Sequence, residues 1–317
     1  MTYRVVLTDQ VFPDTDTERA IFSEIDAVLE ILEDHSPEQI RAQAKDADAL
    51  LTTYAALDRA TLGALDNLKI VSRYGIGVDN IDLDAAKEQG VVVTNVPDYC
   101  VEEVADHTIA LLLAAWRKVV TGNGAVLSGH WGVGSVRPIR RLRGARLGLV
   151  GFGHIGRAVA TRAAAFGMEV ATFDPFLSDD ALEGTGISRA SSLEALLASS
   201  DVVSVHTPLN EHTKGMIDAG AVSQMKDGAI LINTARGPIV ELDAIVSALR
   251  SGKLSGAGLD VFPTEPPEPG SIIDTPGLIA TPHTAFYSDE AIKESQTKAA
   301  QAIVDVLRGR EPTYRIV

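Results

Sequence analysis

Short apolar runs alternate along the chain with longer stretches in which apolar residues recur at helical spacing. This alternation is typical of parallel β-sheets whose strands are joined by helices. In the first third of the chain, strands are predicted at residues 4–7, 49–52, 69–72 and 91–94, and helices at 37–45 and 83–89. Gly, Pro or Asp bounds each of these elements, as expected of strand–helix units.

A second series of the same kind follows a predicted apolar helix at residues 101–120 and a Gly-rich stretch at 122–134, which we interpret as a loop. Glu102 and Glu103 lie in the first turn of that helix, where acidic side chains are favourable. Strands are then predicted at residues 146–150, 169–173, 202–206, 229–233, 256–260 and 278–281. Six strands separated by helices form a doubly wound sheet of the size that binds a dinucleotide.

The last predicted helix, at residues 288–307, has no strand after it, so we expect it to pack on the first domain. A chain of 317 residues is long enough for two domains. The sequence therefore predicts an α/β fold of two doubly wound parallel-sheet domains, with hinges near residues 99 and 288. Residues 1–98 and 289–317 would form a discontinuous substrate domain, and residues 99–288 a dinucleotide-binding domain.

The formal net charge of −15 narrows the range of partners. A field of this sign repels nucleic acid and anionic membranes, so we expect neither, and an anionic substrate would need positive charge within its own site. The lone Cys100 cannot form an internal disulfide, and the longest apolar stretch, residues 109–116, is far shorter than the ~20 residues of a membrane span. We therefore expect a soluble, cytoplasmic protein, and we predict no metal site.

The predicted strand at 146–150 runs into a Gly-x-Gly-x-x-Gly turn formed by Gly151, Gly153 and Gly156. In a dinucleotide site these glycines allow the tight turn, the approach of the pyrophosphate and close helix–strand packing, and the helix that follows holds the phosphates. Asp174 ends the next predicted strand, where a carboxylate can bind both ribose hydroxyls and repel a 2′-phosphate. A plain turn would explain the glycines alone, and a turn-forming role beside Pro175 would explain Asp174 alone. Together they predict NAD, in preference to NADP, as the cofactor.

Three polar residues follow late strands of the same domain, at the edge of the sheet where ligands bind. Arg236, Glu265 and His283 could singly be a solvated loop charge, a turn residue and a buried imidazole. Together they form a complete set for reducing a keto acid. A histidine can donate the proton to the carbonyl oxygen, a carboxylate can orient that imidazole, and an arginine can bind a substrate carboxylate.

With these motifs the whole chain resembles the D-isomer-specific 2-hydroxyacid dehydrogenases. The similar segments are residues 72–80, 104–108, 151–156, 206–209, 233–237, 258–265 and 281–285. The resemblance implies a flavodoxin-like substrate domain, a Rossmann NAD-binding domain, and a homodimer with the helix at 101–120 in the subunit contact. It also implies that the two domains close over the substrate and exclude water.

The same resemblance assigns roles to individual residues. Arg236, Glu265 and His283 would be the catalytic residues. The substrate carboxylate would be held by the backbone of Tyr74, Gly75, Ile76 and Gly77. The cofactor would be bound by Gly151, Gly153, His154, Ile155, Gly156, Asp174, Thr207, Pro208, Thr234, Ala235 and Asp260.

Several features of the sequence indicate which subgroup of this family the chain resembles. Glu265 argues against a formate dehydrogenase, which has glutamine at this place. Residues 49–54 lack the arginine of 3-phosphoglycerate dehydrogenases and we expect no regulatory domain after residue 317, although Arg73 could compensate for the missing charge. The sequence is most similar to dehydrogenases of the C-terminal-binding-protein type, in which an aromatic residue at the place of Phe286, often Trp, can contact the substrate.

Three functions remain open on the sequence. The first is an NAD-dependent dehydrogenase of a small 2-keto acid similar to glyoxylate or hydroxypyruvate. The second is an NAD-sensing scaffold, and the third is a dehydrogenase of a phosphorylated or phosphonate acid. His107 and His130 are candidates for a second acid–base role, but His107 lies on an apolar helix, where a core histidine is the commoner case.

Overall fold

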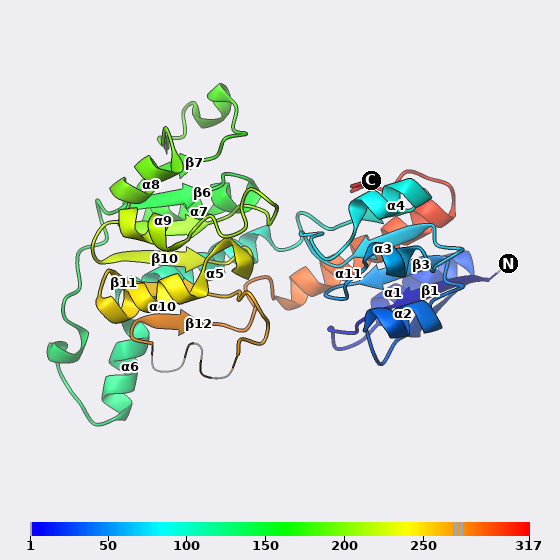
Figure 1. Ribbon diagram of the computed structural model, residues 1–317, viewed down its shortest axis with the longest axis horizontal. Helices are drawn as coiled ribbons and strands as arrows, with labels where there is room; N and C mark the ends of the chain where they lie inside the picture. Colours follow the sequence, from blue (N-terminus) through cyan, green and yellow to red (C-terminus); the bar gives the residue numbers. More distant parts are fainter. Residues whose placement is uncertain (1, 269, 271, 273–274) are drawn as a thin grey trace. The chain divides into compact units, whose positions relative to one another are not determined.

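The computed structural model describes residues 2–268, 270, 272 and 275–317, and the chain forms two compact units (Figure 1). Unit 1 comprises Met1–Cys100 and Ser288–Val317, and unit 2 comprises Val101–Tyr287. The chain therefore leaves unit 1 once and returns to it, so that unit 2 is inserted between two segments of unit 1.

Unit 1 contains a five-stranded parallel sheet with the strand order β2-β1-β3-β4-β5. The strands are β1 Tyr3–Leu7, β2 Ala27–Ile31, β3 Ala49–Thr52, β4 Ile70–Arg73 and β5 Val92–Thr94. This order is that of flavodoxin-like doubly wound sheets, which confirms the predicted fold class of this part. The segment before the C-terminus pairs beside β5, where the Ile316 amide donates to the Val93 carbonyl at 2.8 Å.

Helices cover both faces of this sheet (Figure 1). They are α1 Asp16–Phe22, α2 Pro37–Gln43, α3 Arg59–Leu62, α4 Leu83–Gln89 and α11 Asp289–Leu307, with a 3-10 turn at Ser23–Ile25. One core joins α2, α3 and α4 to the sheet through residues such as Ile40, Leu62 and Ala85. On the opposite face α11 packs against α1 and β4, and the Ser72 hydroxyl donates to the carbonyl of Ala299 at 2.9 Å.

Unit 2 contains a seven-stranded parallel sheet with the order β12-β11-β10-β9-β6-β7-β8. The strands are β6 Arg146–Val150, β7 Glu169–Phe173, β8 Ser188–Arg189, β9 Val202–Val205, β10 Ala229–Asn233, β11 Leu254–Leu259 and β12 Leu278–Ala280. Counted from β6, this is the Rossmann order 3-2-1-4-5-6 with a seventh strand added at the edge. The predicted Rossmann domain is thereby confirmed.

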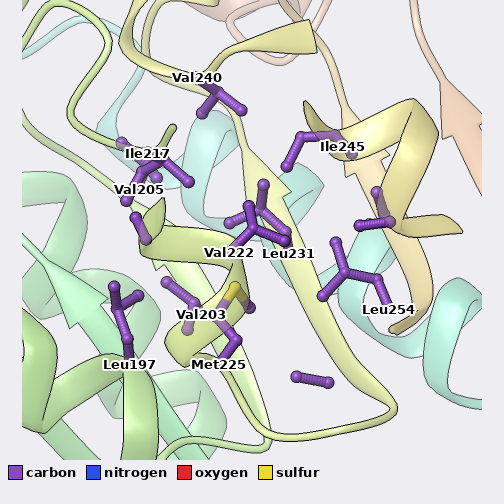
Figure 2. Packing of buried hydrophobic residues seen from close by; sticks show 14 of the residues in the cluster. Leu197, Val203, Val205, Ile217, Val222, Met225, Leu231, Val240, Ile245 and Leu254 are labelled. Carbon is purple, nitrogen blue, oxygen red and sulfur yellow. The ribbon is translucent and has the colours of Figure 1, made fainter. Parts of the chain in front are cut away.

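Two apolar cores flank this sheet. The helices are α5 Val101–Trp116, α6 Val119–Leu127, α7 His154–Ala165, α8 Leu193–Ser199, α9 Ala219–Gln224 and α10 Leu242–Ser251, with 3-10 turns at Val133–Val136, Asp179–Leu182 and Gly237–Ile239. Helices α8, α9 and α10 pack on one face, and Figure 2 shows Val203, Leu231 and Ile245 in this core. Helices α5 and α7 pack on the other face through residues such as Leu112 and Val159.

The structure corrects the prediction between residues 101 and 134. The single helix predicted at 101–120 is two helices, because Lys118 adopts a left-handed φ of 53° between α5 and α6. The Gly-rich stretch predicted as a loop is partly helical, since α6 continues to Leu127 and a 3-10 turn covers Val133–Val136. Strands β2 and β8, both at sheet edges, were not predicted.

Candidate active site

The strand order of unit 2 reverses at β6, because β7 and β8 lie on one side of it and β9 to β12 on the other. In open α/β sheets ligands bind beyond the carboxyl ends of the strands at such a switch point. Gly151 follows β6 and His206 follows β9, and their backbones are in close contact. The glycine turn predicted to bind the cofactor therefore lies at the switch point.

The three glycines of this turn meet different surroundings. A Cβ on Gly151, whose φ is 94°, would lie 2.8 Å from the His206 carbonyl oxygen, and one on Gly156 would lie 2.7 Å from the Gly151 oxygen. A Cβ on Gly153 would meet no atom within 4 Å. Packing within the protein thus requires glycine at positions 151 and 156. Gly153 instead faces open space directly before α7, and no side chain caps the N-terminus of that helix.

Asp174 follows β7 and is oriented by two backbone amides. Its Oδ2 accepts a hydrogen bond from the amide of Phe152, within the glycine turn, and its Oδ1 accepts one from the amide of Phe176, each at 2.9 Å. A carboxylate has about four lone-pair sites, so these bonds orient the group and leave acceptor capacity for a ligand. The structure therefore places Asp174 beside the glycine turn, as a ribose contact requires.

The segment after β9 carries a polar atom without a partner. The Thr207 hydroxyl is buried and forms no hydrogen bond, although buried hydroxyls are normally paired. Next to it His206 is partly buried, and its Nε2 lies 2.9 Å from the Ser204 hydroxyl. Burial lowers the pKa of His206 to about 4, so this imidazole is neutral near pH 7.

The turn after β10 is built by its own side chains. Asn233, which is buried, accepts a hydrogen bond from the Ala235 amide at 3.0 Å and donates one to the Arg236 carbonyl at 2.9 Å. Arg236 is half-buried, and its Nη1 donates to the Ala235 carbonyl at 2.9 Å. A Cβ on the following Gly237 would lie 1.9 Å from the carbonyl carbon of Phe262, so the turns after β10 and β11 are in direct contact.

The turn after β11 brings a carboxylate to an imidazole. Glu265 Oε2 lies 2.7 Å from Nδ1 of His283, and Oε1 accepts a hydrogen bond from the Phe262 amide at 2.9 Å. Burial alone would raise the pKa of Glu265, but the bonds from His283 and Phe262, together with the charge of Arg236, lower it. Glu265 is therefore an ionised acceptor near neutral pH, which fixes His283 with a proton on Nδ1.

Asp260 fixes the loop that carries His283 by accepting hydrogen bonds from it. This carboxylate is 1% exposed and accepts hydrogen bonds from the hydroxyl of Thr281 at 2.5 Å and from the amides of Thr284 at 2.9 Å and Ala285 at 2.8 Å. The His283 amide donates to the Asp260 carbonyl at 2.8 Å, and His283 adopts a left-handed φ of 52°. The ring of Phe286 meets the His283 ring edge-on, with centroids 6.0 Å apart.

The segment predicted to hold the substrate carboxylate lies in unit 1, after β4. The Gly75 carbonyl accepts from the Val96 amide at 2.9 Å and the Ile76 carbonyl from Asn95 Nδ2 at 2.7 Å. Within the described part of the chain, the amides of Ile76 and Gly77 form no hydrogen bond and so remain available to an anion. The Tyr74 amide is not available, because it donates to the Thr52 carbonyl at 2.9 Å. The Tyr74 side chain is 3% exposed, and its hydroxyl donates to Glu18 at 2.5 Å.

Residues 109–285 match the family described as D-isomer specific 2-hydroxyacid dehydrogenase, NAD binding domain. The chain belongs to this family. Unit 2 is accordingly the dinucleotide-binding part of a D-2-hydroxyacid dehydrogenase family member, and its cofactor is a nicotinamide dinucleotide, NAD or NADP.

Relatives within this family have several different names. The chain is 34% identical over 307 residues to a D-3-phosphoglycerate dehydrogenase of Methanocaldococcus jannaschii, a match that covers 96% of this chain but only 58% of that relative's length. A glyoxylate reductase from Paecilomyes thermophila has a similar structure, with a TM-score of 0.90, 29% identity and coverage of 99% of this chain and 98% of that one. A D-lactate dehydrogenase from Aquifex aeolicus, complexed with NAD and lactic acid, gives a TM-score of 0.88 at 30% identity, with 96% of each chain covered.

The residues present in unit 2 fit such a dinucleotide. The unpaired Thr207 hydroxyl lies beside the glycine turn, and Gly153 leaves open space before the uncapped end of α7. The end of α7 would hold the phosphates, because its N–H groups and dipole attract anions, and Asp174 would bind the ribose. Thr234 differs from Thr207, because its hydroxyl lies 2.8 Å from that of Thr108 and is already paired.

Several residues of this site were not predicted from the sequence. Thr281, Thr108 and Ser204 position site residues by hydrogen bonds, and Glu18 binds the Tyr74 hydroxyl. Threonine and serine beside a motif carry no signal of their own. The role of Glu18 could not be predicted, because an acidic residue in the first turn of a helix is usually exposed to solvent.

None of the helices in the described part of the chain is both long enough and apolar enough to cross a membrane. No group of three or more His, Cys, Asp or Glu side chains in the same residues has the arrangement of a metal site.

Proposed function

We propose that the chain is an NAD-dependent dehydrogenase that interconverts a small 2-keto acid and its D-2-hydroxy acid. The observation that carries this proposal is the 2.7 Å contact between Glu265 and His283 in a member of this family. A carboxylate that orients an imidazole is the arrangement that proton transfer to a carbonyl oxygen needs.

In this proposal each polar residue has a distinct task. When bound, the cofactor supplies the hydride in reduction and accepts it in oxidation. Because Nδ1 of His283 is bonded to Glu265, Nε2 is the atom that would give a proton to the carbonyl oxygen and take it back in the reverse direction. Ionised Glu265 stabilises the protonated imidazole before the transfer.

The substrate carboxylate would be bound by cationic and amide groups. The guanidinium of Arg236 is planar, matches a carboxylate and polarises the neighbouring carbonyl group. We propose that the backbone amides of Ile76 and Gly77 are the second contact for this carboxylate. The arrangement provides the local positive charge that a chain of net charge −15 requires for an anionic substrate.

The proposed substrates are acids of the size of glyoxylate or hydroxypyruvate. Phe286 lies edge-on to His283, so an aromatic ring is close to the reacting group and favours a small substituent. Residues 49–54 lack the arginine that phosphoglycerate dehydrogenases carry near this point, so nothing on that segment favours a phosphate. The alternative substrate is a phosphorylated acid, because one relative is named as a D-3-phosphoglycerate dehydrogenase.

We also propose that the protein is a homodimer and is located in the cytoplasm. Val119, Val126, Leu127 and Trp131, all on or after α6, are exposed, with Leu127 at 80% and Trp131 at 91%. Exposed apolar side chains grouped on one segment are typical of a subunit contact. The buried Cys100, which forms no disulfide, is compatible with a reducing compartment.

The test is the absorbance of NADH with a panel of 2-keto acids. The panel contains glyoxylate, hydroxypyruvate, pyruvate, longer and aromatic keto acids, and phosphohydroxypyruvate. Oxidation of NADH by one of the short acids is the expected result. Turnover of phosphohydroxypyruvate alone would favour the phosphorylated class, and NADH binding without any turnover would favour an NAD-sensing scaffold.

A further inference from the structure

We propose that His107 is a positioning residue of this site, which holds the His283 loop in place by donating a hydrogen bond to Thr281. The proposal rests on the proposed function, because it assigns a task to a residue next to the same catalytic set. His107 lies on α5 of unit 2, and not on any of the strand ends that carry Arg236, Glu265 and His283.

The direction of the hydrogen bonds follows from the groups that take part. Nε2 of His107 lies 3.0 Å from the Thr281 hydroxyl and 3.6 Å from Oδ1 of Asp260. The Thr281 hydroxyl has a single proton and donates it to Asp260 at 2.5 Å. It can therefore only accept from His107, so that Nε2 of His107 must carry a proton and donate it.

This chain of bonds ends on the backbone that shapes the catalytic loop. Asp260 also accepts the amides of Thr284 and Ala285, and its own carbonyl accepts the amide of His283. His283 has a left-handed φ of 52°, which a residue with a side chain keeps only when its surroundings enforce it. His107 is the outermost donor of the set of bonds that enforces this conformation.

Packing alone does not account for a histidine at this position. The neighbouring Val104, Thr108 and Leu111 are buried, but the side chain of His107 is 25% exposed. In the described part of the chain, His107 is the one basic side chain within ion-pair distance of Asp260, whose carboxylate is 1% exposed. An apolar residue would fill the same space but would leave the Thr281 hydroxyl without a donor.

The first experiment compares His107→Ala with His107→Gln, because the glutamine amide can place an N–H near the position of Nε2. Thr281→Val and Thr281→Ser form a second pair, in which only serine keeps both hydrogen bonds. We expect kcat to fall about 10- to 100-fold in His107→Ala and Thr281→Val, as for a reacting group displaced by a fraction of an ångström. His107→Gln and Thr281→Ser should recover most of the activity, with the Kd for NADH unchanged in all four variants.

His35→Ala is the matched control, because His35 is exposed in unit 1 and outside the site. It should leave kcat and KM as in the unmodified protein. Unchanged kcat in His107→Ala, or an equal loss in His107→Ala and His107→Gln, would overturn the donor role. Loss of NADH binding in the alanine variant would instead mean that His107 only supports the fold.

A measurement independent of activity separates this inference from the proposed function. In the ¹⁵N-labelled protein, His107 should show a protonated Nε2 whose signal changes in Thr281→Val but not in Thr281→Ser. The ring signals of His283 should shift in His107→Ala and not in His35→Ala. If the protein reduces none of the keto acids, the proposed function fails, whereas unchanged His283 signals in His107→Ala would refute the positioning role.

Discussion

Hydrogen bonds from neighbouring residues fix both the backbone and the side chain of His283. Its amide is bound by the Asp260 carbonyl, and its Nδ1 by Glu265. A side chain held in this way loses little freedom when the transition state forms, which is one source of catalytic efficiency. The imidazole is therefore oriented before any substrate arrives.

Replacement of His283 by alanine should lower turnover by about 10²–10⁴, the usual contribution of general acid–base catalysis. The Kd for NADH should not change, because the glycine turn and Asp174 are unaffected. Stopped-flow absorbance under single-turnover conditions measures the chemical step directly. Turnover equal to that of the unmodified protein would remove His283 from the proposed mechanism.

Asp174 should decide between the two nicotinamide dinucleotides. Its carboxylate, fixed by the amides of Phe152 and Phe176, would repel a 2′-phosphate at the ribose. Asp174→Ala should therefore raise kcat/KM for NADPH relative to NADH, and a comparison of the two cofactors with one keto acid measures the effect. An unaltered ratio would contradict the ribose contact.

His206 should make the fold sensitive to acid. Burial lowers its pKa to about 4 from the ordinary value of 6.5, so between these pH values the unfolded chain binds more protons than the folded one. Stability should therefore fall as the pH decreases from about 6.5 to about 4, by up to roughly 3 kcal/mol from this group. Urea unfolding of the unmodified protein and of His206→Gln at pH 7 and pH 4.5 measures the difference. An equal loss of stability in both proteins would assign the effect to other groups.

Among the elements, the residues that we propose as catalytic depend on contact between two turns. Gly237 lies so close to Phe262 that a Cβ would be 1.9 Å from its carbonyl carbon and 2.5 Å from the nitrogen of Pro263. These are backbone atoms, which cannot move aside as a flexible side chain can. The turn that carries Arg236 and the turn that leads to Glu265 are therefore positioned against each other.

Gly237→Ala should separate these turns. We expect a loss of stability of about 1–3 kcal/mol from overpacking and a fall in kcat of about 100-fold, because Arg236 and Glu265 would no longer lie in place. Gly124→Ala is the control, since a Cβ on Gly124 in α6 would meet no atom within 4 Å. Thermal unfolding and steady-state kinetics of both variants give the result, and wild-type kinetics in Gly237→Ala would show that the turns can move without loss.

The elements also show what the sequence could and could not predict. The strands were found because short apolar runs bounded by Gly, Pro or Asp are distinctive, and Ala49–Thr52 was predicted to the residue. The edge strand β2 was not found, because Glu30 interrupts its apolar run, as an edge strand with an exposed side allows. Helix α6 contains two glycines, each of which costs about 1 kcal/mol in a helix, so a loop was the reasonable prediction.

The site was predictable for a related reason. Arg236, Glu265 and His283 could be singled out because each follows a predicted strand of one sheet, and the structure brings Glu265 and His283 into contact. Their catalytic roles stay predictions. The pairs Gly237–Phe262 and His107–Thr281 could not be foreseen, because they join segments whose contact only the folded chain reveals.

Unit 2 has a sheet and two apolar cores of its own, formed within residues 101–287. Residues 101–287 expressed alone should therefore fold and bind NADH, without reducing any keto acid. Circular dichroism and NADH fluorescence test this. Residues 1–100 are the comparison, because without α11 they leave part of one face of their sheet uncovered. An unfolded 101–287 segment would show that unit 2 depends on unit 1.

The insertion of unit 2 between two segments of unit 1 has a consequence for synthesis on the ribosome. The chain is made from its N-terminus, so β1 to β5 emerge before unit 2, but α11 and the segment that pairs beside β5 emerge after it. Domains generally fold as units while the chain is being made, at about 5–20 residues per second. Unit 2 is complete before α11 has emerged, so the unit that begins second is expected to finish folding first. Until then the part of the sheet against which α11 packs stays exposed, and in this interval a nascent chain of this kind most needs a chaperone.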